Sequence, residues 1–189
     1  MKRRAYIIFA LAVLLPTVVS AQQTPITSQY LTNGLVINPA YAGTRGALSA
    51  NLSYRKQWAR IVGAPQFQNL SLHSPINKKE KVALGLVAEY NTYGVTKDVG
   101  IYAFYAYNVL LGAGRLSMGV KGGVDFSNTN YNNLEFPDGN PADPLLMGNT
   151  KYILPNFGVG FYYYTDKYFA GLSVPSILTY ESDEMDQFK

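Results

Sequence analysis

The stretch RLSMGVKGGVDF, Arg115–Phe126, is the clearest strand in this sequence. From Leu116 to Phe126 every second residue is apolar or glycine, and the residues between them include Ser117, Lys121 and Asp125. A period of two indicates a β-strand, because successive side chains of a strand point to opposite faces. Charged residues in the middle of such a strand, with apolar neighbours on both sides, predict one wet face and one apolar face.

Six further segments show strand patterns, separated by turn signals rich in Gly, Pro and Asn. The first alternates as clearly, with Leu52 and Tyr54 on one face and Arg55 and Gln57 on the other. A polar loop over 127–152 precedes the sixth, and a strand hidden within 127–154 would bring the number to eight. The seven predicted strands are 48–58, 66–74, 82–90, 99–111, 115–126, 155–165 and 168–174.

Composition and strand length favour a barrel in a membrane. Charged residues amount to 15% of the chain, against about 25% in soluble domains. The strands have the length of about nine to eleven residues that crosses a bilayer at a barrel tilt. Tyrosines near the strand ends, at Tyr90, Tyr93, 162–164 and Tyr168, are typical of the aromatic girdles at the two membrane interfaces. We therefore predict an all-β fold, an antiparallel transmembrane β-barrel of the outer membrane with seven to eight strands present.

Residues 1–21 have the features of a secretory signal peptide. Three basic residues at positions 2–4 precede an uncharged apolar run, and small residues before Gln22 predict cleavage after Ala21. The barrel domain is then 22–189. Loss of the three basic residues lowers the formal net charge from +4 to about +1, which leaves no basic surface for nucleic acid. The chain has no cysteine, so an exported domain of this kind forms no disulfide.

The number of strands predicts that the barrel is incomplete. Single-chain bacterial barrels have an even number of strands, at least about eight, whereas seven are predicted here. After Pro175 the sequence becomes acidic and loses its alternation. We therefore expect 22–189 to be part of a larger barrel whose C-terminal strands lie outside this sequence.

No residue pattern predicts catalysis or a metal site. His73 is the only histidine, and it shares a strand face with Ser71 and Asn69. Residues two apart on one strand point in parallel and rarely form a nucleophile–base pair. The sequence has no GxSxG motif, and one His without Cys supplies no zinc ligand set. We predict no catalytic residue, no metal and no cofactor.

Arg55, Gln57 and Asp125 are candidates for a polar network in the barrel lumen. Arg55 and Gln57 lie on the polar face of their strand, and a cation inside a barrel needs a partner. Asp125, Glu89 and Asp98 are the possible carboxylates. Trp58, directly after the strand, is expected to anchor at the membrane interface.

The segment NGLVINPAYAGTRG, 33–46, combines apolar residues with turn formers. Pro39 fixes its own φ and favours an extended Asn38, and Gly43 permits a positive φ. We expect a rigid turn at the periplasmic rim, where the first strand begins. Such a turn either plugs the base of the barrel or docks a partner, and the candidate residues for both roles are Asn38, Pro39, Tyr41 and Gly43.

Most of the chain resembles the PorP/SprF family of outer-membrane proteins of type IX secretion and gliding. The motifs are NPAYAG at 38–43, Tyr54-Arg55 with Gln57-Trp58, and GAP at 63–65, followed in the family's order by YAYNVLL, LSMGVKGGV, LPNFGVGFYYY and GLSVPSIL. The resemblance implies a non-enzymatic barrel that supports export and surface anchoring of large adhesins. Its implied partners are outer-membrane lipids, type IX secretion components, periplasmic peptidoglycan-associated components and the secreted adhesin. Family members are usually longer, which agrees with the expected missing strands.

Two other classes of protein remain as alternatives. A general porin or small-solute transporter would carry rings of charge in its lumen, where this sequence mostly has Gly, Ser and Asn. A soluble secreted sandwich or lipocalin-like barrel would carry Lys and Glu on its outward strand faces. Such a protein would also leave the membrane without detergent.

Overall fold

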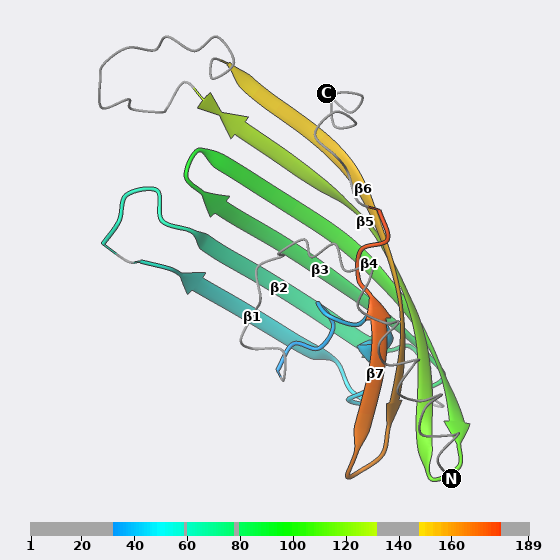
Figure 1. The fold of residues 1–189 in the computed structure, drawn as a ribbon. Coiled ribbons are helices and arrows are strands. Elements are labelled where there is room, and N and C mark those ends of the chain that lie inside the picture. The colour runs from blue at the N-terminus through cyan, green and yellow to red at the C-terminus, as the bar shows by residue number, and fades with distance from the viewer. Residues whose placement is uncertain (1–31, 59, 78–79, 132–147, 179–189) are drawn as a thin grey trace, which may run out of the picture.

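The computed structural model describes residues 32–58, 60–77, 80–131 and 148–178. They form one short 3₁₀ helix and seven strands, each paired antiparallel with its neighbours in chain order. The elements are η1 (Pro39–Tyr41), β1 (Ser49–Lys56), β2 (Gln66–Pro75), β3 (Val82–Tyr93), β4 (Thr96–Leu111), β5 (Gly114–Asn130), β6 (Asn149–Tyr164) and β7 (Phe169–Val174). The sheet curves into a half-barrel, and the segment that precedes β1, drawn in blue, lies in its hollow (Figure 1). No ladder joins β1 to β7 within the described ranges. The predicted all-β antiparallel barrel fold is confirmed.

Alternation gives the sheet an apolar outer face and an inner face of small and polar residues with one buried apolar cluster. In β5, Met118 and Val120 are exposed on the outer face, whereas Ser117 is fully buried on the inner face. The same alternation runs along β1, where Leu52 and Tyr54 are exposed. An extended apolar surface of this kind needs a cover, and for strands of this length the cover is lipid.

The height of the outer apolar band matches a membrane. On β6 it begins at Ile153, after exposed Lys151, and continues through Phe157 and Phe161 to Tyr163. Ten residue steps of about 3.4 Å make about 34 Å along the strand. A strand tilt of about 40° reduces this to about 26 Å across the membrane, close to the band of about 25 Å of outer-membrane barrels.

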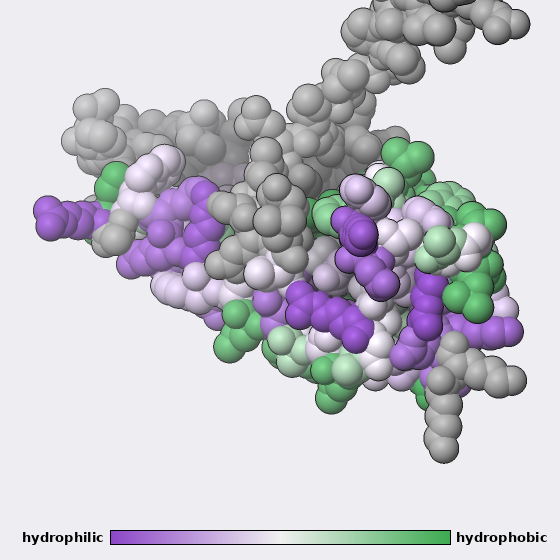
Figure 2. All heavy atoms as spheres, turned by 90° about the horizontal axis from the view of Figure 1, so that it is seen from below, coloured by the Kyte–Doolittle hydropathy of each residue, from purple (hydrophilic) through white to green (hydrophobic). Residues whose placement is uncertain are grey.

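The two ends of the sheet carry connections of different length. At one end, called the short-turn end, the connections are 76–81, 112–113 and 165–168. At the other, the long-loop end, they are 57–65, 94–95 and 131–148. Figure 2, which views the molecule from below Figure 1, shows hydrophilic residues beside hydrophobic ones on this side of the molecule. No helix in the described part of the chain is long and apolar enough to cross a membrane.

The structure corrects several strand details. β5 continues to Asn130 and β6 already begins at Asn149, so both ends of the loop predicted over 127–152 are strand. Tyr162, expected in an interface girdle, lies on the inner face and packs against Tyr41, whereas Tyr90 is exposed on the outer face. The predicted signal peptide and the acidic tail after residue 178 lie outside the described residues, as do 132–147, the middle of the possible eighth strand.

Candidate functional site: the opening segment on the inner face

Residues 32–46, called the opening segment, fold into a series of tight turns before β1. The amide of Asn38 donates to Gly34 O at 2.9 Å, and the amide of Tyr41 donates to Asn38 O at 3.0 Å. Asn38 is extended, with φ −136°, as expected for a residue before proline. Its side-chain Oδ1 accepts from the amide of Ala40 at 2.9 Å, so Asn38 caps η1 while Pro39 takes the first helical position.

The turn rests on a row of small side chains across the inner face, called the small-residue row. Strand pairing aligns one residue from each of five strands, and all of them point inward. The row consists of Ala83, Ala106, Gly119, Gly160 and Ser173. A Cβ on Gly119 would overlap the backbone of Pro39 and Ala40, and one on Gly160 would overlap the Asn38 side chain. The absence of larger side chains therefore allows the backbone of η1 to lie directly on the sheet.

Hydrogen bonds join the turn to the β6–β7 hairpin. Nδ2 of Asn38 donates to Phe161 O at 3.0 Å and, at a longer 3.5 Å, to Leu172 O. Phe161 and Leu172 face each other across β6 and β7. The hydroxyl of Ser173 donates to Ile37 O at 2.8 Å. One amide side chain thus satisfies both its own turn and two strands more than a hundred residues away.

Apolar side chains of the segment fill the hollow of the half-barrel. Leu35 is completely buried in a cluster with Val87, Tyr102 and Phe104. Tyr41 makes edge-to-face contacts with His73 on β2, at 5.7 Å between ring centroids, and with Tyr162 on β6, at 5.6 Å. Burial of one Leu side chain is worth about 1.5–3 kcal/mol, so this packing stabilises the segment in place.

Polar residues of β2 are also satisfied by the opening segment. The Ser71 hydroxyl donates to Asn33 Oδ1 at 2.9 Å, and Asn33 Nδ2 donates to Asn69 Oδ1 at 2.9 Å. Nδ1 of His73 accepts from the amide of Gly43 at 3.0 Å, where Gly43 has φ +73°. Asn69, Ser71 and His73, which share one face of β2, thus each form a hydrogen bond with the opening segment.

The inner wall towards the long-loop end holds a separate polar network around Asp125. The carboxylate accepts from the Tyr102 hydroxyl and, at 2.9 Å, from Asn156 Nδ2. Lys121 Nζ lies 4.4 Å from the centre of the Tyr102 ring. The Tyr102 hydroxyl thus contacts Asp125 and the Tyr102 ring contacts Lys121, and both of these residues lie on β5.

The other two members of the predicted lumen network are not part of it. Arg55 lies on β1, with β2–β4 between it and Asp125, and its guanidinium stands over the Phe67 ring at 5.9 Å. Gln57 follows β1, and its backbone amide donates to Pro65 O at 2.9 Å. The structure therefore does not bring Arg55, Gln57 and Asp125 together.

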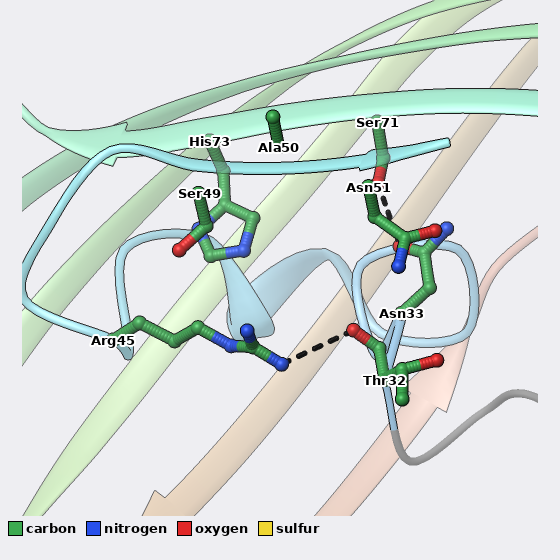
Figure 3. A pocket seen from close by; sticks show the side chains of 8 residues that line it. All are labelled: Thr32, Asn33, Arg45, Ser49, Ala50, Asn51, Ser71 and His73. Atoms are coloured by element: carbon green, nitrogen blue, oxygen red, sulfur yellow. Dashed lines mark hydrogen bonds between the residues drawn. The ribbon is translucent and has the colours of Figure 1, made fainter. Parts of the chain in front are cut away.

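A small hollow lies between the opening segment and the start of β1 and β2 (Figure 3). Arg45 reaches along it to donate to Thr32 O at 3.2 Å, and His73, Ser49 and Asn51 line its wall. Its free volume is about 10 Å³, room for one water, whereas small-molecule pockets are of about 300–1,000 Å³. Among the described residues no three His, Cys, Asp or Glu side chains are placed to hold a metal ion.

Sequence reasoning found the turn but missed Asn33 and the small-residue row. Asn33 is an ordinary polar residue before an apolar run, and no local pattern marks it. The row becomes visible only when the strand register is known, because its members lie in separate segments between Ala83 and Ser173. The repeated small residues on the inner sides of β5 and β6, such as Gly119 and Gly160, were the available signal.

An exposed apolar outer face, an inner face lined mainly by small and polar residues, and an N-terminal segment seated inside define a transmembrane β-barrel protein. The family model described as type IX secretion system membrane protein PorP/SprF matches residues 19–189, so the chain belongs to this family. It is a membrane component of type IX secretion, in a family of outer-membrane β-barrels. No curated protein and no solved structure matched.

Proposed function

We propose that this protein is a non-enzymatic component of the type IX secretion and gliding machinery in the outer membrane of a Gram-negative bacterium. It supports the export and surface anchoring of large adhesins. Family membership carries the first part of this proposal. Its periplasmic partners are secretion components and peptidoglycan-associated proteins, and residues 1–21 are the signal peptide that directs it to the envelope, leaving 22–189 as the barrel domain.

In this proposal the opening segment is an internal plug that closes the base of the barrel. The observation that favours this role is the complete burial of Leu35 together with the bonds from Asn38 to β6 and β7. A segment held by burial and by long-range hydrogen bonds is part of the barrel interior. Asn38, Pro39, Tyr41 and Gly43 then act as plug residues, and a periplasmic partner would reach the exposed side of the same segment.

Deletion of the gene in its own host tests the proposed function. We expect the adhesin to disappear from the cell surface and from the medium, while other outer-membrane proteins keep their abundance. Gliding on agar should stop in a host that glides. Normal surface display of every type IX cargo in the deletion strain would refute the proposal.

Conductance separates the proposal from a porin. A plugged barrel reconstituted in planar bilayers should give no stable open channel, whereas a general porin gives steady single-channel steps.

Two further measurements test the signal peptide and the membrane placement. If residues 1–21 are cleaved, the N-terminal sequence of the purified protein should begin at Gln22. A protein that is extracted without detergent would refute the membrane placement together with the function built on it.

A further inference from the structure

Three lysines stand in one row on the outer face at the long-loop end. Strand pairing joins Lys56 on β1 through β2 and β3 to Lys97 on β4, and Lys97 through β5 to Lys151 on β6. All three side chains are exposed and point to the same side as the apolar band. Lys56, Lys97 and Lys151 are called the lysine row.

The lysine row lies directly above the edge of the apolar band. Two residues further down the strands, the next outer row contains Tyr54, Tyr90 and Phe126. All three are exposed large apolar side chains. Two steps along a strand are about 7 Å, so the ammonium groups reach the level of lipid headgroups while the aromatic rings mark the interface.

The lysine row has no acidic partner in the part of the chain that the structure describes. The ion pair found there joins Arg115 and Glu80, and it lies at the opposite, short-turn end. At that end Lys167 also follows Asp166 directly. Among the described residues, the lysine row is thus a group of three positive charges that faces the lipid side and makes no ion pair.

We propose that the lysine row binds the phosphates of anionic lipid headgroups in the outer leaflet. Neighbouring strands are about 4.8 Å apart, which places Lys97 about 10 Å from Lys151 and about 14 Å from Lys56. These separations allow two phosphates of one glycolipid headgroup, or of two adjacent lipids, to be held at once. Long lysine side chains lie along apolar surface and present the charge to the headgroup layer. The inference rests on the outer-membrane placement in the proposed function.

The test measures binding of lipid A, a glycolipid with two phosphates, to the full-length protein purified in a neutral detergent. Native mass spectrometry gives the number of bound lipids and their affinity. The test variant is K97Q/K151Q, and the matched control K81Q/K167Q removes the same charge from exposed positions at the short-turn end. A parallel titration contains excess inorganic phosphate. Heat-modifiable gel migration verifies that each variant is folded.

We expect K97Q/K151Q to weaken lipid A binding about five-fold for each lysine removed. The control pair should bind as the wild type does, and inorganic phosphate should not displace the lipid. Equal weakening in both pairs would reduce the effect to net charge and overturn the inference, as would unchanged binding in K97Q/K151Q. Displacement by inorganic phosphate would overturn the choice of a lipid ligand.

The failure of this inference is distinguishable from the failure of the proposed function. If K97Q/K151Q binds lipid A normally while gene deletion still abolishes adhesin display, only the lysine row is refuted. If deletion leaves adhesin display intact while the lysine pair controls lipid binding, the secretion role is refuted and the lipid site stands.

Discussion

Asn38 stabilises the opening segment through both ends of its side-chain amide. Oδ1 accepts from Ala40 in the turn, and Nδ2 donates to carbonyl oxygens of β6 and β7. Its neighbour Pro39 has no amide hydrogen to satisfy, and its fixed φ is suited to the first position of η1. The Asn-Pro pair that begins the NPAYAG motif is therefore explained by the hydrogen bonds of Asn38 and by the backbone geometry that Pro39 provides for η1.

Two substitutions at Asn38 separate these roles. Asn38→Ala removes both the cap of η1 and the hydrogen bonds to β6 and β7, and it should lower the free energy of unfolding by about 1–3 kcal/mol. Asn38→Asp keeps the capping oxygen but faces the carbonyl oxygens of Phe161 and Leu172 with a carboxylate, so we expect a loss at least as large. Denaturant titration in micelles, followed through the single Trp58, measures both. Wild-type stability of Asn38→Asp would mean that the bonds to β6 and β7 contribute nothing.

Gly119 should tolerate no side chain, because a Cβ there overlaps the backbone of Pro39 and Ala40. We expect Gly119→Ala to cost about 1–3 kcal/mol through overpacking and to loosen the opening segment. Tryptic cleavage after Arg45, the only basic residue within 32–46, should then become faster.

Gly122 provides the control on the same strand. It lies on the outer face, where an added Cβ would stand at an ordinary 3.8 Å from the Phe157 ring. Gly122→Ala should change stability by no more than about 0.5 kcal/mol and leave the cleavage rate unaltered. If both variants are cleaved at the wild-type rate, the turn does not depend on close approach to β5.

At the scale of the strands, the sequence predicted which side chains point inward or outward better than it predicted where each strand begins and ends. The two faces of β5 were predicted correctly because a half-wet strand repeats every two residues. The start of β6 was placed six residues late, since Pro155 resembles a boundary and is disfavoured inside a sheet. In the structure Pro155 pairs with Val124 within the strand. Local sequence cannot reveal that the neighbouring ladder continues beyond a proline.

The site was less predictable than the strands because it depends on register. Asn33 bonds to Ser71 and Asn69, which lie 38 and 36 residues further along the chain. Arg55 and Asp125 were grouped from their polar faces alone, yet three strands separate them. The polar periodicity indicates that a side chain points inward. Which residue it meets there is set by the order and register of the strands.

β6 allows a test of the apolar band by depth. Phe157 and Ile153 are on the outer face and about half exposed, at 51% and 53%. Phe157 lies near the middle of the apolar band, whereas Ile153 lies at its edge, two residues from Lys151. Arginine at the membrane midplane costs about 2–4 kcal/mol, and near the interface about 0–1. We therefore expect Phe157→Arg to destabilise the barrel by the larger amount and Ile153→Arg by the smaller.

Unfolding in phospholipid vesicles measures both variants of β6, because only a bilayer provides depth. Transfer of the same variants to detergent micelles should reduce the difference between them. Equal costs in vesicles would mean that the outer face does not span the hydrocarbon layer as the strand length predicts.

At the scale of the whole molecule, loop length and charge give the barrel a direction. Outer-membrane barrels have short periplasmic turns and longer extracellular loops. The opening segment lies at the short-turn end and the lysine row at the long-loop end. A plug that enters from the periplasm and lysines that face the outer leaflet are therefore consistent with one orientation of the sheet.

Cysteine labelling tests this orientation without background, because the chain has no cysteine. Val62, in the β1–β2 loop, is fully exposed, and Asp166, in the β6–β7 turn, is also exposed. With a membrane-impermeant maleimide on intact cells, Val62→Cys should be labelled and Asp166→Cys should not. Both should react once the outer membrane is permeabilised, because neither side chain is packed against the sheet. The reverse pattern would place the opening segment at the cell surface, where a plug could not meet periplasmic components, and would assign the lysine row to the inner leaflet.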